Sequence, residues 1–259
     1  MTVIDERARD VPMHLRDRAP NYDRLPTIPG GPAAECDVGW DAIAARLRAT
    51  GARVVVLDVY PGVRRGDVDA LVRALDADDV VRAEDALLPR DEIERLVAPD
   101  VTDDPVFGFV TKLRLGDFFD PVKLAGLRAR VRDARGRVVV HGIGASLVTG
   151  DGVIAFVDVS RWENTLRLRA GEYENLGTGN SETYAGRIYK RAWFVDWRVA
   201  DRHKRALFGR MAFVVDACDS ATPKMIPAGA MFRALRAAAA RPFRVVPYFD
   251  PAPWGGQWM

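Results

Sequence analysis

Short apolar runs alternate with amphipathic segments along most of the chain. The clearest run is the β-branched stretch at residues 54–59, which predicts a buried strand. Further strands are predicted at residues 80–81, 137–141, 153–157, 192–197, 212–215 and 243–246. Apolar positions at helical spacing predict helices at residues 39–49, 67–75, 121–135, 199–209 and 227–240, with one more beginning at Pro89. This alternation predicts an α/β fold in three layers, with a mostly parallel sheet and helices on both faces.

The composition changes twice along the chain. Residues 1–37 combine mixed charge with five prolines, which predicts an extended leader before an α/β domain at residues 38–247. Residues 248–259 carry four aromatic side chains and a single charge, at Asp250. Because free chain ends are usually polar, we expect this last run to pack against a further domain.

Overall composition narrows the class of protein. Apolar residues make up 48% and charged residues 29% of the 259 positions, which is typical of a globular protein. No apolar run approaches the roughly 18 residues that span a bilayer. The two cysteines lie far apart, and the net charge of +2 comes from interspersed signs. These features predict a reduced cytoplasmic protein that binds neither membranes nor nucleic acid.

Candidate chemistry lies where the predicted strands end, because ligands of open α/β sheets bind outside the carboxyl ends of the strands. Asp58 and Tyr60 follow the first strand. Asp158 and Asp196 also end apolar runs, and a carboxylate there suits a magnesium ligand, a general base or a helix N-cap equally well.

Two glycines, Gly142 and Gly144, follow the strand that ends at His141. Glycines let backbone N–H groups approach an anion, so residues 142–146 are a candidate phosphate loop. The alternative is a tight turn, since the lysine of a Walker A loop is missing and Leu147 replaces the third glycine of a dinucleotide motif. Both interpretations remain open.

The densest cationic segment lies at residues 190–205. On a helix that begins near Arg198, the side chains of Arg198 and Arg202 share one face and are candidates to grip a phosphate, with Lys204 nearby. The alternative is a solvated helix laced by pairs such as Asp201 with Arg205.

Metal and serine-hydrolase chemistry have little support in the sequence. The histidines, at positions 14, 141 and 203, share no ligand spacing, and no G-x-S-x-G motif occurs. We therefore expect no metal site within this chain.

Seven segments carry a family resemblance. They are NYDRLP (21–26), GWDAI (39–43), YPGV (60–63), DFFD (117–120), SRWE (160–163), FVDWRVADRHK (194–204) and FDPAPWGGQWM (249–259). Together they resemble the amino-terminal half of long bacterial class I mannose-6-phosphate isomerase-like proteins (phosphomannose isomerases of the cupin type), from about residue 21 to the end.

The resemblance implies a degenerate uridine-kinase-like P-loop fold with a kinase-like three-layer architecture. Residues 39–43 would then occupy the phosphate-loop position, with Asp58 and Tyr60 after the next strand. The lysine and hydroxyl of a working loop are missing there. The resemblance also implies that residues 248–259 open a cupin isomerase domain, whose zinc-binding histidine, glutamate and glutamine are not in this chain.

The expected function is therefore that of an amino-terminal module of a mannose-6-phosphate isomerase-like protein. The family activity interconverts mannose 6-phosphate and fructose 6-phosphate, and this module is expected to bind a sugar phosphate or a nucleotide without the zinc site. Its expected partner is the cupin isomerase domain or subunit. One alternative is a small-molecule kinase that uses Arg198, Arg202 or Lys204, and the other is a structural interaction module.

Overall fold

The computed structural model describes residues 35–241 of the chain. Pro32–Met231 form one compact unit, and a second unit combines Met1–Gly31 with Phe232–Met259. The described part of the second unit is the later portion of helix α10 (Ala228–Ala239) and the two residues after it. The predicted strand at 243–246, the predicted domain opening at 248–259 and nearly all of the predicted leader lie outside the described residues.

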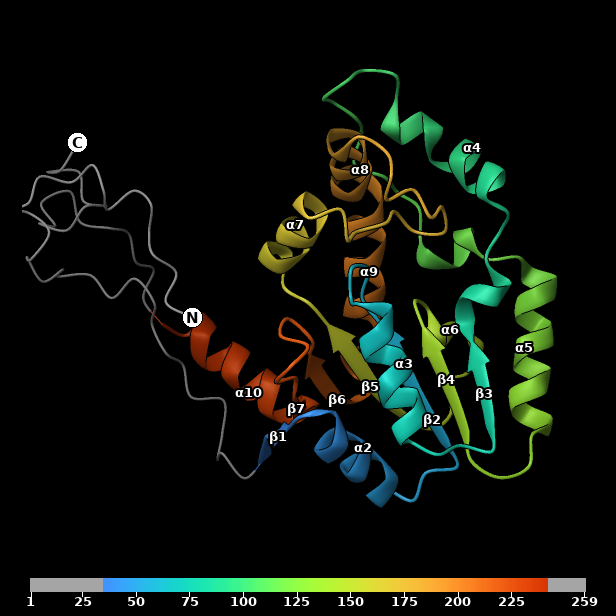
Figure 1. Cartoon of the computed structure of the whole chain (residues 1–259), viewed down its shortest axis with the longest axis vertical. Helices are drawn as coiled ribbons and strands as arrows, with labels where there is room; N and C mark the ends of the chain where they lie inside the picture. The colour runs from blue at the N-terminus through green and yellow to red at the C-terminus, as the bar shows by residue number, and fades with distance from the viewer. Residues whose placement is uncertain (1–34, 242–259) are drawn as a thin grey trace, which may run out of the picture. The chain divides into compact units, whose positions relative to one another are not determined.

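The first unit contains a seven-stranded sheet in the order β1-β7-β6-β5-β2-β4-β3 (Figure 1). The strands are β1 (Asp37–Val38), β2 (Val54–Val59), β3 (Asp79–Arg82), β4 (Val138–Gly142), β5 (Val153–Asp158), β6 (Met211–Asp216) and β7 (Lys224–Pro227). Strands β3, β4, β2, β5 and β6 are parallel, whereas β7 runs antiparallel to β6 and β1 antiparallel to β7.

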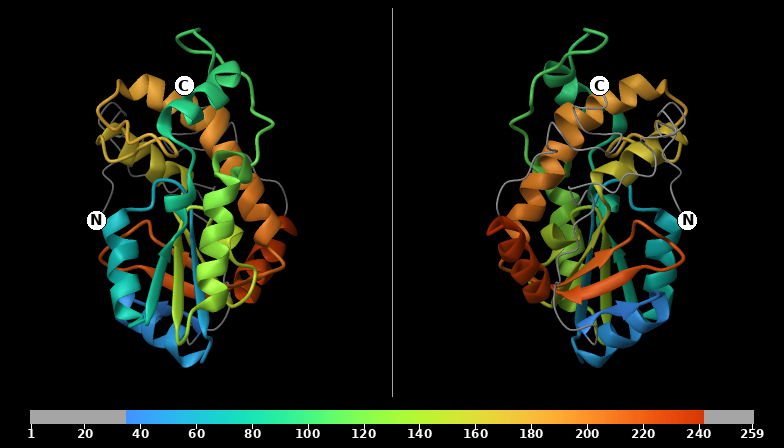
Figure 2. Two further views of the ribbon diagram at one scale, coloured as in Figure 1. Left: turned by 90° about the vertical axis from the view of Figure 1, so that its right-hand side faces the viewer. Right: turned by 90° about the vertical axis from the view of Figure 1, so that its left-hand side faces the viewer.

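Helices cover both faces of this sheet (Figure 2). Helices α2 (Trp40–Ala49) and α3 (Arg65–Ala74) cover one face, and α5 (Pro121–Asp133), α6 (Ala145–Val148) and α9 (Trp197–Leu207) cover the other. Helices α4 (Arg90–Val101), α7 (Arg161–Arg169) and α8 (Ala185–Arg191) lie beyond the carboxyl ends of the strands (Figure 1). The 3-10 turns η3 (Ala83–Ala86) and η4 (Leu115–Phe118) and the π-helical turn η5 (Ala192–Asp196) complete the set.

The central strand β2 explains the layering, because all six of its residues are buried. Val54 and Val56 face one core, with α5, α6 and α9. Val55 and Leu57 face the other core, with α2 and α3. Successive strand residues point to opposite faces, so a strand with apolar residues at consecutive positions must be covered on both sides. The predicted α/β class, with a mostly parallel sheet in three layers, is confirmed.

One predicted strand was wrong. Residues 192–197 are helical, and they continue α8 through the π turn η5 into α9. Ala192, Val195 and Val199 are buried at helical spacing, and a short apolar run does not distinguish a strand from a buried helix. Asp196 therefore does not end a strand.

Helix α7 was missed because two of its three buried side chains are polar. Its buried residues are Asn164, Arg167 and Leu168, and the hydroxyl of the N-cap Ser160 accepts a hydrogen bond from the Glu163 amide. A hydrophobic pattern gives no signal for such a helix. Strand β7 was also not predicted.

The topology creates a crevice at the carboxyl ends of β2 and β4. These neighbouring strands lead to helices on opposite faces, β2 to α3 and β4 to α6. The loops after them therefore diverge, and ligands of open α/β sheets bind at such a switch point.

Residues 39–43, expected at the phosphate-loop position, do not form the loop after the central strand. The loop after the central strand consists of residues 60–64, which lead directly into α3. Residues 39–43 instead begin α2, where the Gly39 amide donates to the Pro223 carbonyl and the Trp40 indole to the Ser220 carbonyl.

Candidate ligand-binding site

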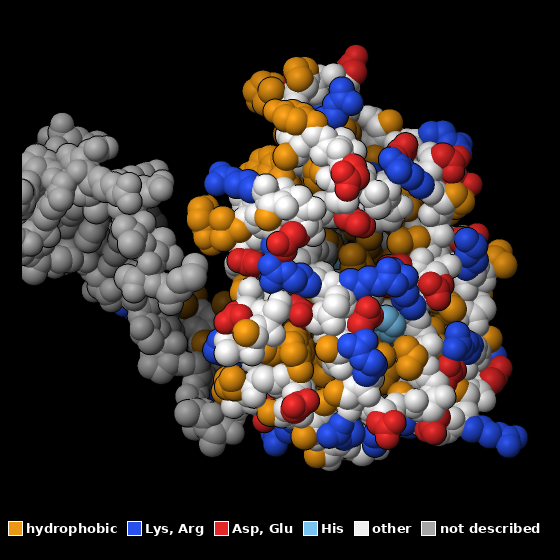
Figure 3. All heavy atoms as spheres, in the orientation of Figure 1, with side chains coloured by type: hydrophobic (Ala, Val, Ile, Leu, Met, Phe, Trp, Pro, Cys, Tyr) orange, Lys and Arg blue, Asp and Glu red, His pale blue; other side chains and the backbone are white. Residues whose placement is uncertain are grey.

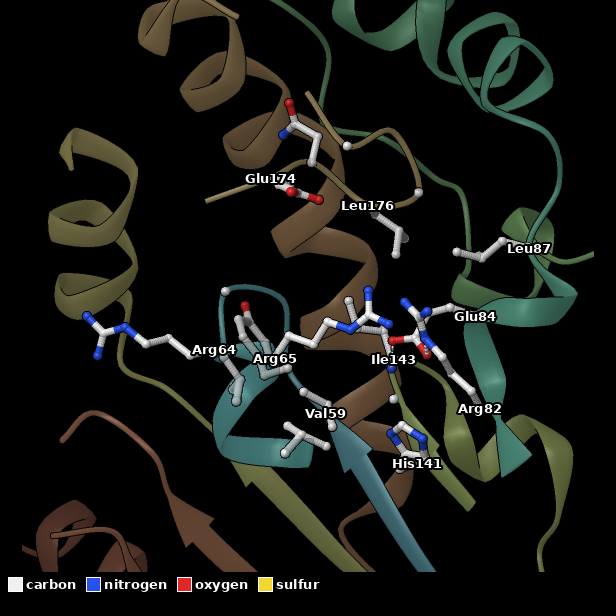
Figure 4. Close-up of a pocket in the computed structure, with 18 of the residues that line it drawn as sticks. Val59, Arg64, Arg65, Arg82, Glu84, Leu87, His141, Ile143, Glu174 and Leu176 are labelled. Carbon is white, nitrogen blue, oxygen red and sulfur yellow. Dashed lines mark hydrogen bonds and ion pairs between the residues drawn. The ribbon is translucent and has the colours of Figure 1, made fainter. Parts of the chain in front are cut away.

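A pocket of about 410 Å³ occupies this switch point. Its lining comes from the loops after β2 and β4, the first turns of α3, the end of β3, and the 172–179 loop (Figure 4). This volume lies within the range of small-molecule sites.

The loop after β2 is held rigidly by helix α7. The Asn164 side-chain amide donates to the Pro61 carbonyl at 2.9 Å, and the Arg167 guanidinium donates to the Gly62 carbonyl at 2.7 Å. Gly62 has a φ of 93°, and a Cβ there would lie 1.9 Å from the Asn164 Oδ1. Only glycine fits this position without strain.

The first turn of α3 opens onto the pocket. Arg64 is the N-cap and makes no side-chain capping bond, so the amides of the first turn lack a cap from it. The start of a helix carries a partial positive charge and attracts anions.

Two guanidinium groups converge on the same space. Arg65 reaches from α3 and Arg82 from β3, and their side chains point toward one another in Figure 4. Their nearest carboxylates are loosely placed, with Asp69 at 3.9 Å from Arg65 and Glu84 at 3.4 Å from Arg82. Arg64 instead turns away and forms a close pair with Glu172 at 2.8 Å.

His141, on β4, lies within the electrostatic reach of both arginines. Burial lowers the pKa of His141, and the charges of Arg82 and Arg65 lower it further, against the opposing effect of Asp69. The pocket therefore favours the neutral imidazole, and an anion bound between the arginines would raise this pKa.

The carboxylate of Glu84 occupies the turn after β4. It accepts a hydrogen bond from the Ile143 amide at 2.8 Å, and a Cβ on Gly142 would lie 1.9 Å from its Oε2. That Oε2 is buried and, within residues 35–241, its only charged contact is the Arg82 pair, which lacks hydrogen-bond geometry. Burial raises the pKa of Glu84.

A second carboxylate occupies the same turn, since the Ser146 amide donates to Asp58 Oδ2 at 2.8 Å. Two amides that a phosphate loop would offer are thus taken by carboxylates. The arrangement supports the tight-turn interpretation of Gly142 and Gly144, of which Gly142 lines the pocket.

Asp58 lies on the face of β2 that α9 covers, and it contacts both α9 and the start of α6. His203 Nε2 lies 3.0 Å from Asp58 Oδ2 and 3.1 Å from the Ser146 hydroxyl. A serine–histidine–aspartate relay needs the two ring nitrogens to serve different partners. Here one nitrogen serves both, so the cluster is not such a relay.

Tyr60 and Lys204 belong to the same covered region. The Tyr60 hydroxyl donates to Asp201 Oδ1 at 2.7 Å and accepts from the Arg161 guanidinium at 3.0 Å. Burial, followed by the hydrogen bond to Asp201, raises the pKa of Tyr60. Lys204 forms an ion pair with Asp158, whose pKa is raised by burial.

The remaining candidate residues bond to other groups of the protein, outside the pocket. Arg198 donates to the Trp193 carbonyl at 3.1 Å and stacks on that ring. Arg202 donates to the carbonyls of Thr111 and Leu113. Asp196 is fully buried next to Arg191 and is not exposed to the pocket. Of the predicted site residues, only Tyr60 and Gly142 line the pocket.

The residues that shape the pocket were partly within reach of the sequence. Arg65 lies just after the YPGV segment, so the strand-end rule points to it. Arg82 is the last residue of β3, but only the strand order reveals that it faces α3.

Within the described range 35–241, no three histidine, cysteine or acidic side chains lie close enough together to hold a metal ion. The same part of the chain contains no helix with the length and apolar character needed to cross a bilayer.

Comparison with known proteins gives a family but no activity. No curated protein matches the chain. A family model described as "Domain of unknown function (DUF8485)" matches residues 39–240, which include the whole parallel sheet, and the chain therefore belongs to this family.

Proposed function

We propose that this chain binds a phosphorylated small molecule, in the first place a sugar monophosphate, as the amino-terminal module of a mannose-6-phosphate isomerase-like protein. The observation that carries the proposal is the convergence of Arg65, from the first turn of α3, and Arg82, from the end of β3, on one part of the pocket (Figure 4). Guanidinium groups and helix N-termini are the groups with which proteins bind phosphate.

The charges of the pocket support one phosphate rather than several. Arg64 is already paired with Glu172, which leaves Arg65 and Arg82 with loosely placed partners. These two guanidinium groups suit one phosphate group, which would replace Asp69 and Glu84 as their closer anionic partner.

The rest of the lining supports a hydroxylated ligand. Glu172, which is paired with Arg64, and Glu174 also line the pocket, and carboxylates accept hydrogen bonds from hydroxyl groups. No tryptophan or phenylalanine is among the described residues of the lining, and its one tyrosine, Tyr60, has its hydroxyl bonded to Asp201. A sugar therefore suits this wall better than a nucleobase.

The kinase alternative loses its proposed phosphate grip. Arg202 is bonded to backbone carbonyls and Lys204 to Asp158. We propose binding without phosphoryl transfer, and the isomerase reaction is assigned to the cupin partner.

Calorimetric titration of the full chain with mannose 6-phosphate, inorganic phosphate and AMP tests the proposal. We expect mannose 6-phosphate to bind more tightly than phosphate, and AMP to add nothing over phosphate. Arg82→Gln should weaken binding by about tenfold or more, because a hydrogen bond to a charged group contributes roughly 1.5–3 kcal/mol.

A matched control is Arg73→Gln, which removes the same charge from the last turn of α3. Absence of any binding at millimolar concentration would overturn the proposal. An equal loss of affinity in the Arg73 and Arg82 variants would mean that binding depends on net charge and not on a site at Arg82.

A second candidate, an interaction module for the cupin domain, is favoured by one surface. Val106, Phe107, Tyr184, Tyr189 and Trp193 are exposed around a groove beside α8, at the upper end of the molecule in Figure 3. Exposed apolar patches commonly mark protein interfaces. Sedimentation of the chain with a cupin isomerase domain should give a complex that Trp193→Asp abolishes. Unchanged association of this variant would exclude the groove as the interface.

A further inference from the structure

One wall of the pocket is a loop that is hydrogen-bonded to a buried ion pair. Residues 174–179 line the pocket, and Figure 4 shows Glu174 and Leu176 on the side away from His141. This segment, called the 174–179 wall below, belongs to no helix or strand.

The carboxylate of Asp196 holds the start of the wall. Its Oδ2 accepts the side-chain amide of Asn175 at 2.6 Å and the Leu176 amide at 3.4 Å. Its Oδ1 pairs with the Arg191 Nε at 3.3 Å.

The guanidinium of Arg191 holds the middle of the wall. One arm donates to the Leu176 carbonyl at 2.7 Å, and the other lies 3.5 Å from the Thr178 hydroxyl. Both charged side chains are at least 90% buried, at 8% exposure for Arg191 and 0% for Asp196. Almost every polar atom of the pair is therefore committed to the wall or to its partner.

The π turn η5 explains how these two side chains meet. Arg191 and Asp196 are five residues apart, and in a regular α-helix such residues point about 140° away from each other. The wider turn at Ala192–Asp196 brings them onto one face. Single π turns inside helices are frequent at functional sites.

We propose that η5 makes Arg191 and Asp196 a positioning pair, which fixes the 174–179 wall at the distance from Arg65 and Arg82 that a sugar phosphate requires. The inference rests on the proposed function and adds to it how the site distinguishes a sugar phosphate from phosphate alone. The arginines bind the phosphate, and the wall selects what is attached to it. A buried ion pair adds little stability over apolar residues, so its use here is geometric.

Two variants test the pair. Asp196→Asn keeps the shape but removes the charge that Arg191 faces. Arg191→Lys keeps the charge and loses the fork to Leu176 and Thr178, which guards against the possibility that the first variant fails to fold. Arg187→Lys makes the same substitution at an exposed position of α8 and serves as the control.

The readout is the affinity for mannose 6-phosphate divided by that for inorganic phosphate, measured with the full chain. We expect this ratio to fall at least fivefold in both variants and to stay unchanged in the control. Affinity for inorganic phosphate itself should stay within twofold of wild type, which general destabilisation of the pocket would not allow.

Hydrogen exchange of the wall amides is measured in parallel. Faster exchange at 176–179 in both variants, with unchanged exchange in β2 and β4, is the expected result. An unchanged affinity ratio with unchanged wall exchange would overturn the inference. If wild type binds neither ligand, the proposed function fails, and the positioning role is then decided by exchange alone, where unchanged protection overturns it.

Discussion

Charged side chains lie on both sides of β2, but they have different surroundings on each side. Toward β5, the charged groups are paired and covered by α9, as in the Lys204–Asp158 pair and the Asp201 contacts of Tyr60. Toward β4, Arg65 and Arg82 have loose partners and face a cavity. We call these the closed side and the open side.

The difference lies in what covers each side rather than in residue type. Helix α9 covers the ends of β2 and β5, because His203 contacts Asp58, Lys204 contacts Asp158, and Asp201 contacts Tyr60 just after β2. The helix that follows β4, α6, is only four residues long, and the pocket lies beside it over the ends of β2 and β4. The closed side should therefore govern stability, and the open side should govern ligand binding.

The largest expected effect is on the closed side. Asp58→Ala removes the acceptor of the Ser146 amide and the partner of His203. Leaving buried polar groups without partners should lower the free energy of unfolding by about 3 kcal/mol. Urea denaturation measures this, and a loss below about 1 kcal/mol would show that Asp58 is not a structural group.

A change at the boundary of the two sides should affect both. Gly62→Ala places a Cβ against Asn164 at a φ of 93°. The strain should cost about 2 kcal/mol of stability and also weaken phosphate binding, because the loop lines the pocket. Thermal denaturation and titration together check this, with Gly66→Ala, which has open space around its Cβ position, as the control.

On the open side, Glu84→Gln should increase anion affinity by about threefold to tenfold at neutral pH, since it removes a negative charge beside Arg82. The raised pKa of Glu84 sets the pH dependence. In wild type, affinity rises as pH falls through that pKa, because the carboxyl group becomes neutral. The variant should lack this component.

Titration with sulfate, whose own charge stays constant, measures the wild-type and Glu84→Gln affinities across the pH range. The pKa of His141 also affects binding, so the difference between the two proteins at each pH isolates Glu84. A constant difference down to pH 4 would contradict the assigned role.

The smallest expected effect, on stability, tests whether the closed side and the open side act independently. Tyr60→Phe removes the hydroxyl between Asp201 and Arg161, which still pair with each other at 2.9 Å. We expect a loss of about 0.5–1 kcal/mol in stability and no change in phosphate affinity. A fall in affinity of more than threefold would mean that the two sides are coupled through this residue.

The strands and helices could be predicted from the sequence better than the residues of the site. Strand β2 was predictable because a strand buried on both faces is mostly apolar, and Asp58 is the one charged residue in 54–59. The α8–η5–α9 column was not, because Ala192 to Val195 form an apolar run that suits either a strand or a helix.

The site depends on features that local patterns do not carry. Arg82 meets Arg65 only because β3 ends beside β4, which is a matter of strand order. Asn164 and Arg167 resemble solvent-exposed helix residues in sequence, yet they are buried because loop carbonyls need donors. The strand-end rule found Tyr60 because it needs no knowledge of which strands are neighbours.

The outer edge of the sheet has a consequence for the order in which the domain assembles. Strand β1 precedes every parallel strand in the chain but pairs only with β7, which follows them all. A ribosome must therefore release the chain beyond residue 227 before β1 finds its partner. Until then the five parallel strands must collapse with β6 as an unprotected edge, which is the stage most exposed to wrong pairing with another chain. Strand β7 then covers the edge of β6, and the two-residue strand β1 pairs with β7 to become the new edge.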